Sequence, residues 1–279
     1  MYIGIKIARE ALGISRELPE GAEMEPCLVI GIGLVEIGEY EEGLEVCRRN
    51  ADLAREEQNA SWLWANLDNL GRAYEALLDL QEARRVHEEA LELSRGQGPL
   101  YEVYSSIRLC AVAALSEDWE EAYAHAKRAH EGKTSLHVLD GFYLHHQVEA
   151  LLREGDERSA REEARRFADR AKVNELDRVA YLCSLADLSE WEGDTQSAID
   201  HLREAHTLAE KVGVPGEMWQ IQSRLGVIHE RRGEIEEARE AFSRAAQTLR
   251  TLAGKIRDEK LRENFLSALW VRRVLGHTN

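Results

Sequence analysis

The chain has 279 residues, 44% of them apolar and 32% charged, which is enough to bury a substantial core. Its formal net charge is −16, from 36 basic and 52 acidic residues, and no Lys/Arg run is long enough to form a basic patch. Direct nucleic-acid binding is therefore not expected. No apolar stretch approaches the length of a membrane span, and residues 1–10 lack the pattern of a signal peptide, so we expect a cytoplasmic protein that does not contact membranes.

Residues 1–20 form the first predicted element. Ala, Leu, Glu and Arg are abundant along the chain and only four prolines occur, a bias that favours α-helix. Ile5, Ala8, Leu12 and their neighbours lie at helical spacing, which predicts the second helix of a repeat whose first helix would precede Met1. We therefore expect the chain to be part of a longer protein. An uncovered apolar face on residues 1–18 would favour homo-oligomers that form through the terminal repeats.

A repeated pattern follows, from residue 24 to residue 254. The clearest copy contains Leu67, Leu70, Gly71, Tyr74, Ala83 and Ala90. A second copy has the same internal spacings and contains Leu225, Gly226, His229, Gly233, Ala238, Phe242 and Ala245. Six residues occupy equivalent turn positions, 38 to 40 residues apart: Gly38, Leu78, Glu117, Gly155, Gly193 and Gly233.

Six helical hairpins follow from this spacing. They are predicted over residues 24–60, 61–98, 100–133, 134–173, 174–213 and 215–254, and a C-terminal capping helix with its tail over residues 256–279. The small residues at equivalent positions allow two helices to cross closely. Asp118, Asp156 and Asp194 follow turns and are expected to cap the next helix. The fold class predicted is all-α, a right-handed α-α superhelix of about six hairpins.

The pattern resembles the tetratricopeptide repeat family, whose repeat places Leu-Gly and Tyr on a first helix and Ala, Phe and Ala on a second. The resemblance covers nearly the whole chain. The fourth copy departs from it, with Gln147 and Val148 where Leu-Gly would stand. The period here is longer than the usual one and is similar to the extended-helix variant of bacterial regulatory proteins. What the resemblance implies is a scaffold for protein–protein interaction.

The last segment, "IRDEKLRENFLSALWVRRVL", has an amphipathic pattern that would cover the exposed end of the last repeat. It also resembles the end of the repeat regions in large bacterial signalling ATPases, cyclases, kinases and LuxR-type transcription regulators. The resemblance implies that the chain is the sensor portion of such a regulator, without the nucleotide-binding or output domain.

A concave groove is the expected binding surface, because stacked hairpins curve and their first helices line the inside. The residues predicted to face it lie off the packing stripe: Asp68, Arg72, Tyr104, Ile107, Phe142, His145, Glu149, Asp187, Trp191 and Gln220. Arg72 is the one clear cation among them. This composition disfavours the basic cradle with which chaperone-binding tetratricopeptide domains hold a C-terminal carboxylate. Tyr and Trp beside charged groups suit a peptide, a protein segment or a compact small molecule.

Two short motifs imitate nucleotide sites without their context. Gly132-Lys133-Thr134 lacks the glycine that a phosphate-binding loop needs five residues earlier, where Lys127 stands. Gly31-Ile32-Gly33 lacks the third glycine of a dinucleotide fingerprint, because Glu36 occupies that position. Both are better explained by turns and helix packing.

Catalysis and metal binding find no support either. His145 and Glu149 lie one helical turn apart, but no third metal ligand is evident, and the four cysteines are scattered. No nucleophile can be matched to a base. We therefore predict a non-enzymatic sensor or interaction domain without cofactor, whose partner is a protein, a peptide or a small-molecule inducer. The alternative is a freestanding scaffold or adaptor.

Overall fold

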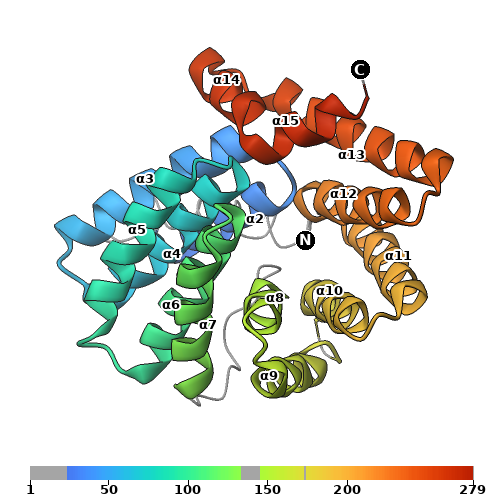
Figure 1. Cartoon of the computed structure of the whole chain (residues 1–279). Helices are drawn as coiled ribbons and strands as arrows, with labels where there is room; N and C mark the ends of the chain where they lie inside the picture. Colours follow the sequence, from blue (N-terminus) through green and yellow to red (C-terminus); the bar gives the residue numbers. More distant parts are fainter. Residues whose placement is uncertain (1–23, 133–144, 173, 279) are drawn as a thin grey trace.

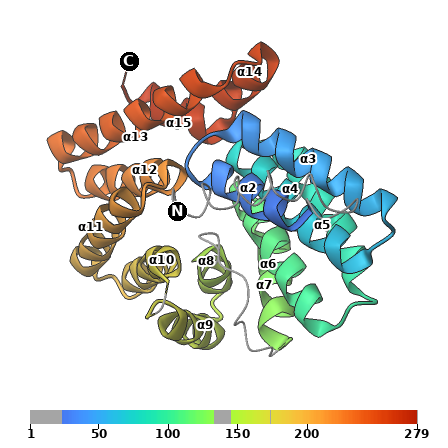
Figure 2. The ribbon, with the colours of Figure 1, turned by 180° about the vertical axis from the view of Figure 1, so that it is seen from behind.

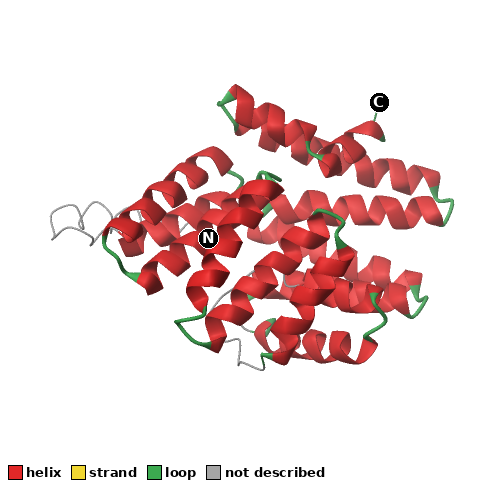
Figure 3. Ribbon diagram, turned by 60° about the vertical axis from the view of Figure 1, so that its left-hand side comes forward, coloured by secondary structure: helices red, strands yellow, loops and turns green. Residues whose placement is uncertain are grey.

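The computed structural model describes residues 24–132, 145–172 and 174–278. Within these ranges the chain is helical and contains no strand (Figure 3). The expected helix over residues 1–20 lies outside them. No helix of the described part is long and apolar enough to cross a membrane.

Twelve of the helices pair as six hairpins. The first three hairpins are α2 (Met24–Glu36) with α3 (Tyr40–Glu56), α4 (Ala60–Ala76) with α5 (Leu80–Ser94), and α6 (Pro99–Leu115) with α7 (Trp119–Glu131). The next three are α8 (His145–Arg153) with α9 (Glu157–Arg170), α10 (Glu175–Trp191) with α11 (Thr195–Val212), and α12 (Pro215–Arg231) with α13 (Ile235–Lys255). The hairpins follow one another around a ring, with α8, α10 and α12 on its inner side and α9, α11 and α13 outside (Figure 1).

The turns inside the hairpins share one backbone conformation. All six residues that the sequence equates have a positive φ, from 56° at Leu78 to 82° at Gly38. Glycine tolerates this left-handed conformation, whereas Leu78 and Glu117 adopt it at a cost of about 1 kcal/mol each. The repeat spacing therefore identified the turns even where no glycine marks them.

The second helix of several hairpins begins with a side-chain cap, as expected. Asp118, Asp156 and Asp194 each accept a hydrogen bond from a backbone N–H three residues later, at 3.0–3.2 Å. Pro99 and Pro215 begin α6 and α12, where a missing N–H is harmless.

Small residues bring the two helices of a hairpin together. A Cβ on Gly71 would collide with the His87 ring, and a Cβ on Gly226 with the Phe242 ring. Ala83 and Ala198 are fully buried at the crossings. Most buried apolar residues of the first four hairpins join those of the C-terminal segment in one cluster, while most of those of α10 to α12 form a second.

The C-terminal segment is two short helices where the sequence predicted one. It forms α14 (Glu259–Ser267) and α15 (Leu269–Gly276), separated at Ala268, whose ψ of 141° is extended. The break turns the chain so that Phe265, Val271 and Val274 are all buried. We call residues 257–278 the strap.

The strap closes the ring by contacting the first hairpin. At the end of α13, just before the strap, Lys255 Nζ lies 2.8 Å from Glu39 Oε1, although 216 residues separate them. The backbone N–H of Arg257 donates to Glu41 at 2.5 Å. The Phe265 and Tyr40 rings meet edge to face, with 6.1 Å between centroids. Both ribbon views show α14 beside α3 (Figures 1 and 2).

A second contact joins the strap to the third hairpin. The indole N–H of Trp270 donates to the Leu115 carbonyl oxygen at 2.7 Å. Arg273 forms an ion pair with Glu117 in the left-handed turn. Both the first and third hairpins therefore hold the C-terminal end of the chain.

A larger side chain where two helices cross closely should destabilise the fold. We expect Ala198→Leu to lower the free energy of unfolding by about 1–3 kcal/mol, because Ala198 has no room for three more carbons. Urea denaturation measures the effect. Ala124→Leu on the exposed face of α7 is the matched control and should change stability by less than about 0.5 kcal/mol. Equal effects would contradict the close crossing.

Glu217 should make stability depend on pH. It is 8% exposed where α12 approaches the first hairpin, and burial, helped by the nearby charge of Glu36, raises its pKa to about 8. Because this folded-state pKa lies above that of the unfolded chain, its contribution to stability is present at low pH and is lost as pH rises from about 4 to about 8. Glu217→Gln should therefore be more stable than wild type at pH 9, by about 1–3 kcal/mol, and equal to it at pH 4.

The control for this comparison is Glu88→Gln, at an exposed position of α5. It should leave the pH profile of the unfolding free energy unchanged. A Glu217→Gln profile that runs parallel to wild type would show that Glu217 does not carry the dependence.

Candidate functional site

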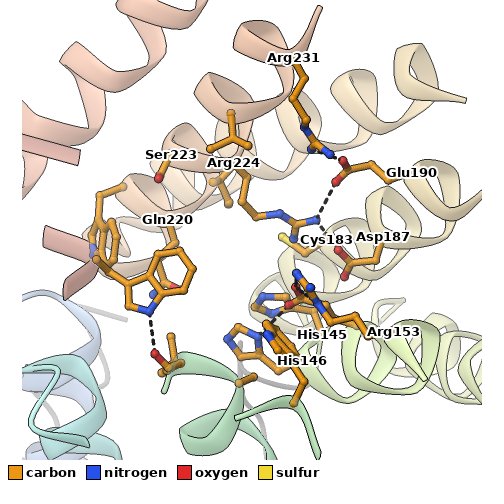
Figure 4. A pocket seen from close by; sticks show the side chains of 18 residues that line it. His145, His146, Arg153, Cys183, Asp187, Glu190, Gln220, Ser223, Arg224 and Arg231 are labelled. Carbon is orange, nitrogen blue, oxygen red and sulfur yellow. Dashed lines mark hydrogen bonds and ion pairs between the residues drawn. The ribbon is translucent and has the colours of Figure 1, made fainter. Parts of the chain in front are cut away.

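A cavity of about 220 Å³ opens on the inner side of the ring (Figure 4). Residues of α8, α10 and α12 form most of its lining. The end of α6, the start of α7 and Trp270 of the strap complete it. The site therefore depends on residues from four hairpins and from the segment that closes the ring.

Aromatic rings form part of the wall. Trp219 is 3% exposed, and the Arg153 guanidinium lies 3.7 Å above the Trp119 ring in a cation–π contact. Trp270 lines the cavity while its N–H is held by Leu115. Flat rings and the side chains of Leu115 and Ile221 make this wall suitable for an apolar body.

Ion pairs form another part of the wall. The Arg224 guanidinium of α12 pairs with Asp187 of α10 and lies 3.8 Å from Glu190. Arg231 pairs with Glu190 at 2.5 Å. On α8, Arg153 pairs with Glu149 at 3.0 Å, and His146 Nδ1 lies 3.4 Å from the other Glu149 oxygen.

Two buried polar atoms of the Asp187–Arg224 pair form no hydrogen bond within the described part of the chain. Asp187 Oδ2 and Arg224 Nη1 have no hydrogen-bond partner among the described residues. The indole N–H of Trp219 also forms no hydrogen bond within that part of the chain. An unsatisfied buried polar group costs about 1–3 kcal/mol, so the cavity offers unused binding capacity.

Burial and neighbouring charges set the ionisation of these groups. Burial, helped by Glu149 and Glu190, raises the pKa of Asp187 to about 8, although Arg224 opposes the shift. Burial lowers the pKa of Arg224, but the surrounding carboxylates outweigh it and hold that pKa above its usual range. Burial likewise opposes ionisation of Glu149, yet the hydrogen bond from His146 and the nearby arginines hold its pKa below the usual range. Burial raises the pKa of the Cys183 thiol to about 12, so it is neutral.

Four of the ten predicted groove residues come together here: His145, Glu149, Asp187 and Gln220. They belong to three successive first helices, as the repeat register placed them.

The other predicted residues lie elsewhere. Asp68 is buried against Arg108 at 3.0 Å, and Arg72 pairs with Glu36 at 2.8 Å. Tyr104 and Ile107 are in the core, and the Tyr104 ring packs against Trp64 of the preceding first helix, with 6.3 Å between ring centroids.

Two predicted residues remain. Trp191 is 47% exposed beyond the cavity, and its N–H donates to Glu157 at 3.3 Å. Phe142 lies outside the described residues.

Sequence reasoning missed the arginines and tryptophans of the cavity, including Arg224 and Trp219. One signal was available. Arg224 follows Asp187 by 37 residues, close to one repeat, so the two occupy neighbouring positions on adjacent first helices. Trp270 had no such signal, because its position depends on the path of the strap.

Metal binding has no evident site in the described part of the chain, where no group of three His, Cys, Asp or Glu side chains is placed to hold an ion.

Comparisons with known proteins identify the fold. No protein-family model matches the sequence, and no curated protein matches it significantly. The crystal structure of the apo form of RapI superposes with a TM-score of 0.67 at 14% identity, over 90% of this chain and 92% of that one. The Cut9–Hcn1 hetero-tetramer structure of the APC/C gives a TM-score of 0.59 at 16% identity, over 97% of this chain and 52% of that one. The fold is the tetratricopeptide-type helical repeat.

Replacing Arg224, the cation paired with Asp187, should lower the stability of the fold by an amount that depends on pH. We expect Arg224→Gln to lower the free energy of unfolding by about 2–4 kcal/mol at pH 9, since Asp187 then lacks its counter-charge near Glu149 and Glu190. The loss should be smaller at pH 6, where Asp187 can hold a proton. Adding Asp187→Asn should recover part of the loss at pH 9. Additive effects of the two substitutions in urea denaturation would contradict the pairing.

Proposed function

We propose that the chain is a non-catalytic repeat scaffold that binds a compact ligand, or a side chain of a protein or peptide partner, in the central cavity. The supporting observation is the unused donor of Arg224 and the unused oxygen of Asp187, both buried at an aromatic-lined cavity. A partner that pairs with these atoms recovers the free energy that their lack of a hydrogen-bond partner costs. The neutral thiol of Cys183 is a poor nucleophile, which favours binding over chemistry.

A sensor role is the form of this function that we favour. Trp270 belongs both to the cavity wall and to the contact that fixes the strap on Leu115. A ligand that touches Trp270 binds the closed ring better than an open one, and so stabilises it. The resemblance of the strap to the ends of bacterial regulator repeats supports the same role. In this role the closed ring is the conformation that an output domain recognises in a cytoplasmic signalling or transcription regulator.

A scaffold or adaptor is the second candidate. Trp191 supports it, since this large aromatic is 47% exposed at the end of α10, outside the cavity. Exposed tryptophans are frequent anchors of protein interfaces. In that case Trp191→Ala would abolish partner binding, and substitutions in the cavity would not.

Native mass spectrometry tests the cavity-binding function. The full chain is incubated with the small-molecule and peptide fraction of a cell lysate, and retained adducts are recorded. We expect an adduct on wild type that is lost in Arg224→Gln. The matched control is Arg161→Gln, on the outer surface of α9, which should retain it. An absent adduct, or one that both variants retain, would contradict binding in the cavity.

A further inference from the structure

We infer that the ligand of the central cavity is a small organic acid, whose carboxylate pairs with Arg224 and Asp187 while its apolar body lies against the tryptophans. This inference rests on the proposed function, because it names the class of ligand for the same site.

The hydrogen-bond donors of the cavity favour a ligand that accepts hydrogen bonds. Arg224 Nη1 and the Trp219 N–H are donors without a partner in the described chain. Arg153 and Arg231 add guanidinium groups whose side chains are 51% and 63% exposed, so both remain open to solvent at the same cavity. Carboxylate oxygens accept hydrogen bonds and match the planar guanidinium fork.

Asp187 is the group that decides whether an anion can enter. Its Oδ1 is already paired with Arg224, and its Oδ2 is unused. When Asp187 carries a proton, Oδ2 donates to a ligand carboxylate and the network gains one positive charge. When it is ionised, it repels the same ligand. The pKa of about 8, raised by burial and the neighbouring carboxylates, makes the first state the main one at neutral pH.

The charged and titratable groups around Asp187 come from three helices. They are Cys183 and Glu190 of α10, Arg224 and Arg231 of α12, and His145, His146, Glu149 and Arg153 of α8. Arg224 is a cation at any pH of interest, Glu149 is an anion and Cys183 is neutral. The raised pKa of Asp187 lies between pH 6.5 and 9.5. Because His145 and His146 line the same cavity, the Asp187→Asn variant is needed to assign a pH dependence in this range to Asp187.

The volume of the cavity limits the size of the ligand. A volume of about 220 Å³ lies below that of most drug-sized pockets, and aromatic rings form part of the wall beside the ion pairs. A short acid with a flat or branched apolar body fits this combination.

Three probes of equal shape test the inference. Benzoate, benzamide and benzamidinium share a ring and differ in charge, and their dissociation constants for the full chain are measured by calorimetry at pH 6.5 and pH 9.5. We expect benzoate to bind most tightly at pH 6.5. Its affinity should fall about tenfold or more at pH 9.5, since the proton on Asp187 is lost between the two. Preferential binding of benzamide or benzamidinium would overturn the inference.

Substitutions locate the effect. Asp187→Asn keeps a donor at every pH, so it should retain benzoate binding and remove the pH dependence. Arg224→Gln should weaken benzoate about tenfold or more, while Arg161→Gln should not change it. If none of the probes binds, the acid inference fails. A lysate adduct that depends on Arg224 would still support a binding cavity, so the two failures are distinguishable.

Discussion

Closure of the ring is the constraint on which the rest of the structure depends. Each hairpin is rotated relative to the one before it, and after six of them the chain returns to its start. The strap then joins α13 to the first and third hairpins through Tyr40, Phe265, Trp270 and Leu115. Tyr104 and Ile107 are buried in the core, where Tyr104 packs against Trp64 of the preceding first helix. A cavity lies between α8, α10 and α12, and Trp270 of the strap forms part of its wall.

Charge pairs between successive first helices form a second regularity. Glu36 pairs with Arg72, Asp68 with Arg108 and Asp187 with Arg224, at separations of 36, 40 and 37 residues. Each places an acidic side chain one repeat before its arginine. At these three junctions the following hairpin supplies a counter-ion for an acidic side chain of the hairpin before it, which allows both groups to be largely buried. Of these three pairs, Asp187 with Arg224 is the one that lines the central cavity, which makes it a candidate binding site.

Local features of the fold were predictable from the sequence, and long-range ones were not. The turns, the Asp caps and the close crossings at Gly71 and Gly226 depend on residues within one hairpin, so their spacing carries the information. The path of the strap depends on contacts across 150 to 220 residues, such as Trp270 with Leu115. The break at Ala268 has no helix-breaking residue to announce it. For the same reason the register predicted four residues that line the cavity, His145, Glu149, Asp187 and Gln220, but not the tryptophans beside them.

Carbodiimide crosslinking tests the closed ring most directly, because it joins an ammonium and a carboxylate only where they touch. Lys255 and Glu39 should crosslink within one chain, in the monomer band at low protein concentration, and Glu39→Gln should abolish the product. Lys211 and Glu175, paired on neighbouring helices, are the internal control for reactivity. If Lys211 crosslinks to Glu175 while Lys255 and Glu39 join only between two chains or not at all, the ring is not closed and the central cavity lacks the part of its wall that Trp270 forms.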